Sequence, residues 1–326
     1  MIAAWMLYCT AVAVLLICAA VPLERFVQHR GGGTRRVWFA ALTGVIAIPV
    51  LGVLVRDGAP AVEVGNEVVP VSATRGLVME QVQTLASLDA VLASLWMIAS
   101  VSVLALIAFG LAGTWRRSRA WGGATVDGVE VLVSDDVGPA VIGLLRTRIV
   151  LPSWALDLSR GQRAMMLRHE QEHVSAGDPR LVFFAALVAA AFPWNPGVWF
   201  MLRRLRLAIE VDCDDRVVRS ADMDLRGYAE LLLTVGSRRS VPAYGVGFSV
   251  GRPFLEERID RMTLPRAGRS RAHAALLVLG LGGVLGAVWS LPQPVRAAWV
   301  SETVQWCDDG NADLTRGLLQ AYDWST

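Results

Sequence analysis

Four long apolar stretches punctuate the chain and set its organisation. They cover residues 2–22, 37–55, about 90–113 and about 272–290. Each is close to the roughly 20 residues that a helix needs to cross the hydrocarbon core of a bilayer. The pattern predicts three transmembrane helices within 1–114, a polar domain at 115–271, a fourth transmembrane helix at 272–290 and a short tail at 291–326.

The segments that flank these stretches differ in charge. Arginine is concentrated in 23–36 and at both ends of 115–271, whereas the 57–88 loop contains four acidic residues and one arginine. Arginine-rich flanks favour the cytoplasmic side of a membrane. We therefore expect both termini and the 57–88 loop outside the cell membrane, and 115–271 in the cytoplasm. No basic residue precedes the first stretch, which disfavours a cleaved signal peptide there.

The polar domain begins with β-type patterns and continues with helical ones. Runs rich in β-branched residues predict strands at 129–133 and 148–151, the second ended by Pro152. Helices are predicted through 165–174 with Ser159 or Ser153 as the cap, and over about 197–220 and 225–237. The predicted fold is an α-helical membrane protein with a mainly helical cytoplasmic domain that carries a small β element.

The apolar stretch at 181–200 allows two interpretations. Its uninterrupted part is only about a dozen residues before Pro193, which is short for a span. We expect a buried helix of the polar domain, or one packed on the membrane face. A re-entrant segment is the alternative.

Composition agrees with a membrane protein. Hydrophobic residues make up 54% and charged residues 18% of the chain, against about 45–50% and about 25% in soluble proteins. The net charge of +2 and the lack of a basic stripe give no reason to expect direct nucleic-acid binding. The four cysteines form no CxxC pair, which excludes a zinc ribbon or a thioredoxin-like motif.

A metal-binding pattern occupies residues 169–173, which read His-Glu-Gln-Glu-His. Residues four apart share a helix face, so His169 and His173 can bind one ion, and imidazole nitrogens suit Zn²⁺. Glu170 is the candidate general base, because it can take a proton from a water molecule that zinc acidifies. This spacing is typical of zinc peptidases.

A catalytic zinc ion usually has three protein ligands, so one more is needed. Glu210 is our candidate, on the helix predicted after the apolar stretch, with Cys213 as the competing choice. Asp214, one turn after Glu210, is expected to hold the free nitrogen of a ligand imidazole. Asp178 is expected either to do the same or to cap the next helix. The other nearby acidic residues are expected to face solvent: Glu172, Asp212 and Asp215.

Three ordered segments carry a resemblance to a known family. They are 167–173 (Leu-Arg-His-Glu-Gln-Glu-His) with Asp178, 193–196 (Pro-Trp-Asn-Pro) and 210–215 (Glu-Val-Asp-Cys-Asp-Asp). Together they resemble the BlaR/MecR-type integral-membrane metallopeptidases. The resemblance implies a gluzincin-like fold, zinc ligands at His169, His173 and Glu210, and catalysis by Glu170. It also implies cleavage of a cytoplasmic repressor, with self-cleavage in some members. The large penicillin-binding domain of the antibiotic sensors is not expected, since only 291–326 follow the last span and the chain has no lysine for a Ser-x-x-Lys motif.

The expected function is therefore that of a membrane zinc endopeptidase. Its expected partners are the lipid bilayer and a cytoplasmic protein substrate such as a repressor, with homo-oligomerisation left open. The alternative is a membrane signalling or scaffold protein whose metal site is structural or vestigial, but such a site needs no base like Glu170. A transporter is disfavoured, because no acidic or basic residue interrupts the middle of the spans. Tyr228 or an arginine remains open as the group that stabilises the oxyanion.

Overall fold

The computed structural model describes residues 2–56, 75–219, 224–238 and 252–263, together with Gly280, Gly282, Gly283 and Gly286. The described elements are, in chain order, α1 (Ile2–His29), α2 (Arg35–Arg56), α3 (Arg75–Ser118), β1 (Gly122–Val126), β2 (Val129–Ser134), β3 (Ala140–Ile142), β4 (Arg148–Pro152), the 3-10 helix η1 (Ser153–Asp157), α4 (Arg160–Ala176), α5 (Asp178–Ala191), α6 (Pro196–Val218), α7 (Leu225–Ser237) and α8 (Arg252–Thr263). The predicted mainly helical fold with a small β element is confirmed.

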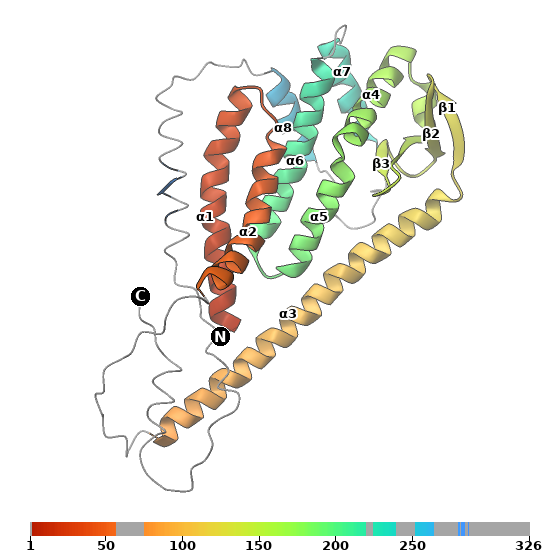
Figure 1. Ribbon diagram of the computed structural model, residues 1–326. Helices are drawn as coiled ribbons and strands as arrows, with labels where there is room; N and C mark the ends of the chain where they lie inside the picture. The colour runs from red at the N-terminus through yellow and green to blue at the C-terminus, as the bar shows by residue number, and fades with distance from the viewer. Residues whose placement is uncertain are drawn as a thin grey trace.

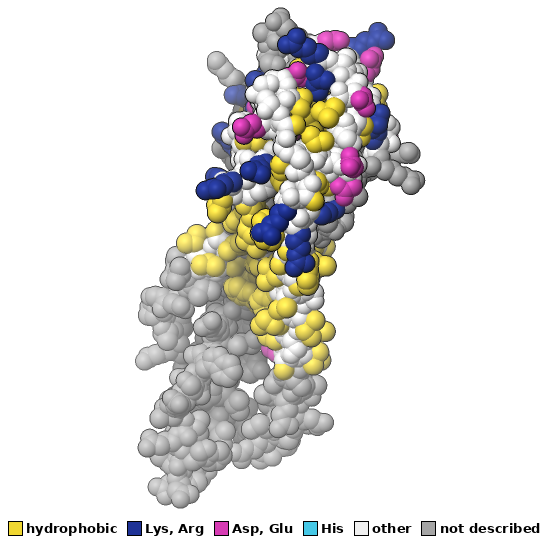
Figure 2. Space-filling view, turned by 90° about the vertical axis from the view of Figure 1, so that its right-hand side faces the viewer, with side chains coloured by type: hydrophobic (Ala, Val, Ile, Leu, Met, Phe, Trp, Pro, Cys, Tyr) yellow, Lys and Arg dark blue, Asp and Glu magenta, His cyan; other side chains and the backbone are white. Residues whose placement is uncertain are grey.

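Three of the described helices are long and apolar enough to cross a membrane. These stretches are Ile2–His29, Arg35–Gly52 and Leu88–Ser118. Large apolar side chains are exposed along the third. Among the coloured side chains of Figure 2, the apolar ones gather in the lower part and the charged ones in the upper part. An exposed apolar surface of this extent fits contact with lipid.

Two predicted segments, the 57–88 loop and the fourth span, are only partly covered by the described residues. Helix α3 begins at Arg75, so the predicted 57–88 loop ends earlier than expected, and its remaining part, 57–74, lies outside the described residues. The predicted fourth span at 272–290 also lies outside them, apart from the four glycines named above. The described residues therefore support the first three spans only.

Helices α5 and α6 form a hairpin that packs beside α1 and α2 (Figure 1). Trp38 and Leu42 of α2 and Met201 and Leu205 of α6 are fully buried in the shared core. The long helix α3 diverges from this bundle and contacts α5 and α1 near one end of the hairpin. The apolar stretch at 181–200 therefore packs among the candidate spans.

Asn195 at the turn of this hairpin fixes its depth along α1. Its side-chain oxygen accepts from the Gly197 amide at 3.0 Å, which caps α6, and its amide nitrogen donates to the Cys9 carbonyl at 3.2 Å. On the other side, the Trp96 indole of α3 donates to the Ala191 carbonyl at 2.9 Å. The turn thus lies level with the N-terminal half of α1. Helices α4 and α5 taken together are also long and apolar enough to cross a membrane, but with a bend of 59° between them.

The four-stranded sheet has the order β1-β2-β4-β3. Strands β1 and β2 form an antiparallel hairpin around Asp127 and Gly128, both at positive φ, while β2 and β4 are parallel. The predicted strands at 129–133 and 148–151 are confirmed, and β1 and β3 are additional. Ile149 and Leu151 of the sheet share a buried cluster with Met166 of α4, so the sheet supports the helix that carries the histidine pair.

Candidate metal centre

Helix α4 carries the His-Glu-x-x-His pentapeptide in its second half. The Ser159 hydroxyl accepts from the Gln162 amide and starts the helix, and Gly177, at a φ of 69°, ends it. The helical spacing brings the two imidazoles together, with Nε2 of His169 and Nε2 of His173 3.1 Å apart. Two potential ligand atoms therefore converge on one point.

Glu210 of α6 faces the same point. Its Oε2 lies 3.6 Å from Nε2 of His169, and its Oε1 lies 3.8 Å from Nε2 of His173. Ligand atoms about 2.1 Å from a tetrahedral zinc ion lie about 3.4 Å from one another. The three separations bracket this value, so the side chains fit a three-ligand metal site.

Cys213, the competing ligand, lies on the other side of His169. Ligand atoms of His169, His173 and Cys213 all lie within 4.8 Å of one another, so this set could also hold a metal ion. However, Sγ of Cys213 lies 3.4 Å from Nδ1 of His169 and 3.4 Å from the His169 carbonyl, which can accept from the thiol. Glu210 instead lies near the Nε2 atoms of both imidazoles, which are the closest pair of ring nitrogens.

The outward nitrogens of both imidazoles have hydrogen-bond partners. Nδ1 of His173 lies 2.8 Å from Oδ2 of Asp178, and Nδ1 of His169 lies 2.9 Å from the Tyr228 hydroxyl, which donates to Asp214 at 2.7 Å. Such partners favour protonation of Nδ1 and leave the Nε2 lone pairs directed inward. The structure thus gives His169 its partner through Tyr228, with Asp214 itself 3.5 Å away.

The sequence leaves the roles of Asp178 and Tyr228 open. Asp178 opens α5, but no side-chain hydrogen bond caps that helix, and the carboxylate lies beside His173 instead. Tyr228 is fully buried, with its hydroxyl occupied by His169 and Asp214, which disfavours it as an oxyanion donor. Both side chains are placed to orient an imidazole.

Arg258 of α8 joins Glu210 and Asp214, two of the four acidic residues of α6. It forms two hydrogen bonds with Asp214, at 2.7 and 2.8 Å, and its Nη1 lies 3.0 Å from Oε2 of Glu210. Burial alone would raise the pKa of Glu210, but the charges of Arg258 and the imidazoles lower it well below its ordinary value. Glu210 therefore stays a carboxylate, the form that binds a metal.

Glu170 is the remaining acidic group of the cluster and is only 4% exposed. Burial raises its pKa, and the charges of His169 and His173 partly oppose that rise. A carboxylate with a raised pKa is the stronger proton acceptor when it is ionised. Its surroundings therefore suit a general base.

All three acidic residues expected to face solvent have partners, and the partner of Asp215 is Arg219 at 3.2 Å. Glu172 binds Arg168 at 3.1 Å and Arg216 at 2.9 Å. Asp212 is buried and accepts hydrogen bonds from the start of α2, with its closest donor, the Thr34 amide, at 2.8 Å. The expectation for Asp212 was wrong because the packing of α2 against α6 is not visible in the local sequence, and Glu172 meets Arg216 because α4 packs against α6.

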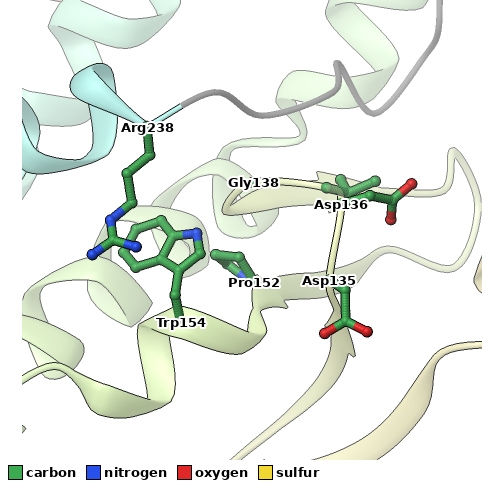
Figure 3. Close-up of a pocket in the computed structure, with 7 residues that line it drawn as sticks. Asp135, Asp136, Gly138, Pro152, Trp154 and Arg238 are labelled. Atoms are coloured by element: carbon green, nitrogen blue, oxygen red, sulfur yellow. The ribbon is translucent and has the colours of Figure 1, made fainter.

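A cavity of about 240 Å³ lies elsewhere, beside the sheet (Figure 3). The Arg238 guanidinium lies over the Trp154 ring, 4.3 Å from its centroid, and Asp135 and Asp136 also line the cavity. In Figure 3 the two carboxylates point away from the indole. The cavity contains none of the candidate metal ligands.

Two comparisons with known proteins gave matches. The profile of the family described as BlaR1 peptidase M56 matches residues 5–262. The Regulatory protein BlaR1 of Bacillus licheniformis is similar, with 28% identity over 125 residues. That alignment covers 37% of this chain and 21% of the relative, so the chain matches only a minor part of that protein.

The contact of Tyr228 with His169 predicts an effect on metal affinity. We expect Tyr228→Phe to weaken zinc binding on the order of 10-fold, because the imidazole loses the partner that orients it while the core keeps its shape. Competition with a chromogenic chelator measures this in the detergent-solubilised protein. The matched control is Tyr8→Phe, in a separate apolar cluster of α1. Equal zinc affinity in Tyr228→Phe and the parent would show that Tyr228 does not orient His169.

Proposed function

The chain belongs to the BlaR1 peptidase M56 family, and from this premise we propose that it is a membrane-embedded zinc endopeptidase with a gluzincin-like catalytic domain. One observation carries the proposal: the Nε2 atoms of His169 and His173 and the carboxylate of Glu210 converge on one point, and all three side chains interact electrostatically with the buried carboxylate of Glu170. The proposed substrate is a cytoplasmic protein such as a transcriptional repressor, or the chain itself.

In this proposal His169, His173 and Glu210 hold the zinc ion. Zinc, when bound, supplies Lewis acidity that polarises a peptide carbonyl and acidifies water. Glu170 would accept a proton from the water that adds to the peptide carbonyl carbon and forms the new C–O bond, and would then return that proton to the nitrogen, so that the C–N bond breaks and the amine leaves. The buried position of Glu170 supports this role, since a purely structural metal site, as in a signalling scaffold, would need no adjacent base.

We also propose that the protein is a multi-pass protein of the cell membrane, with α1, α2, α3 and 272–290 as spans and the zinc site on the cytoplasmic side. The α5–α6 hairpin would enter the bilayer from the cytoplasm as a re-entrant element. Two hydrogen bonds support this element: Asn195 donates to the Cys9 carbonyl, and Trp96 donates to the Ala191 carbonyl. Cys9 and Trp96 both lie within candidate spans.

Replacement of the proposed base tests the enzymatic role. We expect Glu170→Gln to lower proteolysis by about 10²–10⁴-fold with little loss of zinc, because glutamine cannot take the proton of water. The readout is the set of new protein N-termini, labelled and identified by mass spectrometry, in cells that produce the parent or the variant.

The matched control is Glu172→Gln, the same substitution two residues along, where the side chain is paired with Arg168 and Arg216. It should keep most of the activity. Cleavage products that appear equally with Glu170→Gln and the parent would contradict the proposed base.

Reporter fusions test the topology. Alkaline phosphatase is active only outside the cytoplasm, so we expect high activity from a fusion within 57–74 and low activity from one directly after α3. This follows from the arginines at the end of α3, Arg116 and Arg117, which favour the cytoplasmic side. The opposite pattern of activities would invert the proposed orientation and place the metal site outside.

A further inference from the structure

The start of the second membrane helix is fixed onto the helix that carries Glu210. Asp212 of α6 accepts from the Thr34 amide at 2.8 Å, from the Thr34 hydroxyl at 3.0 Å and from the Arg35 amide at 3.0 Å. Gly33 permits this approach, because a Cβ there would lie 3.0 Å from Oδ2 of Asp212. Asp212 thus caps α2 and joins a candidate span to α6, two residues from the proposed ligand.

The side chain of Arg35 reaches a second part of the metal centre. Its Nη1 lies 2.6 Å from Oδ1 of Asp178, and the other oxygen of that carboxylate lies 2.8 Å from Nδ1 of His173. Asp178 has a side chain only 4% exposed. A buried carboxylate needs a charge partner, and here Arg35 also fixes the oxygen that His173 does not use.

Arg35 is the closer of two arginines that face Asp178. Nη2 of Arg216 lies 4.0 Å from the carboxylate, while its Nε donates to Glu172 at 2.9 Å. Arg35 comes from a distant part of the chain, 143 positions before Asp178. Its guanidinium therefore connects α2 to the junction of α4 and α5, which follows shortly after His173.

We propose that Arg35 is a positioning residue for the metal centre, which holds the imidazole of His173 through Asp178, so that the second membrane helix contributes to zinc binding. The inference rests on the proposed function, because it takes His173 to be a zinc ligand. Through the Arg35 guanidinium on Asp178 and the Asp212 carboxylate that caps α2, the end of one span contacts α6, which supplies Glu210, and the first residue of α5, whose carboxylate holds His173.

A double-mutant cycle on zinc affinity tests this role. Zinc affinity is measured by chelator competition on the full-length protein for the parent, Arg35→Ala, Asp178→Ala and the double variant. We expect Arg35→Ala to weaken binding on the order of 10-fold and Asp178→Ala at least as much. The double variant should bind like Asp178→Ala alone, because Arg35 acts through that carboxylate. Arg35→Lys should recover part of the loss, since it restores the charge without the forked geometry.

Arg36→Ala is the matched control, because Arg36 is the exposed neighbour on the same helix end. It should bind zinc like the parent. Thermal unfolding of the metal-free variants separates folding from metal affinity, and the visible absorption of the cobalt-substituted variants reports the geometry around the metal. An Arg35→Ala protein that is less stable yet binds zinc like the parent has lost only a structural contact, and this result overturns the proposal.

Two further outcomes are decisive. Fully additive losses in the double variant would show that Arg35 does not act through Asp178. A parent that binds no zinc would overturn the proposed function together with this inference, whereas a parent that binds zinc with Arg35→Ala unchanged would overturn this inference alone.

Discussion

Two imidazoles one helical turn apart must direct Nε2 to a common point while each Nδ1 stays hydrogen-bonded in a buried site. This requirement governs the metal centre. Asp178 satisfies Nδ1 of His173, and Tyr228, backed by Asp214, satisfies that of His169. Each carboxylate would be costly to bury alone, by several kcal/mol for an unpaired ion. Arg35 and Arg258 offset that cost, so the orientation of both imidazoles depends on residues far away in the chain.

Helix α6 is where these contacts meet. Glu210 and Asp214, one turn apart, face the metal centre, and Asp212 between them faces the start of α2. A single helical turn therefore serves both the proposed catalytic site and its attachment to a candidate membrane span. The α5–α6 hairpin, of which this turn is part, packs among α1, α2 and α3. This packing leaves little freedom for α6 to move independently of the spans. The geometry links the proposed peptidase chemistry to the membrane helices.

Short-range sequence patterns predicted many of the helices and the histidine pair of the metal centre. Hydrophobic run length located α1, α2 and the apolar part of α3, and the i, i+4 spacing of His169 and His173 gave a shared helix face. Strand β1 begins with two glycines and β3 has three residues, so neither has the β-branched run that marks a strand. The contacts of Arg35, Arg258 and Tyr228 with the metal centre could not be predicted from the sequence, for a different reason. Their roles come from tertiary contacts between distant segments, such as the 143 positions between Arg35 and Asp178, which no local pattern encodes.

The identity of the third ligand is the most direct test of this arrangement. Zinc bound per chain should be measured by elemental analysis on the purified parent, Glu210→Gln and Cys213→Ser after equal dialysis against a weak chelator. We predict about one zinc per chain in the parent and in Cys213→Ser, and a large loss in Glu210→Gln, since a catalytic site uses three protein ligands. Zinc retained in Glu210→Gln and lost in Cys213→Ser would contradict the arrangement and assign the site to His169, His173 and Cys213.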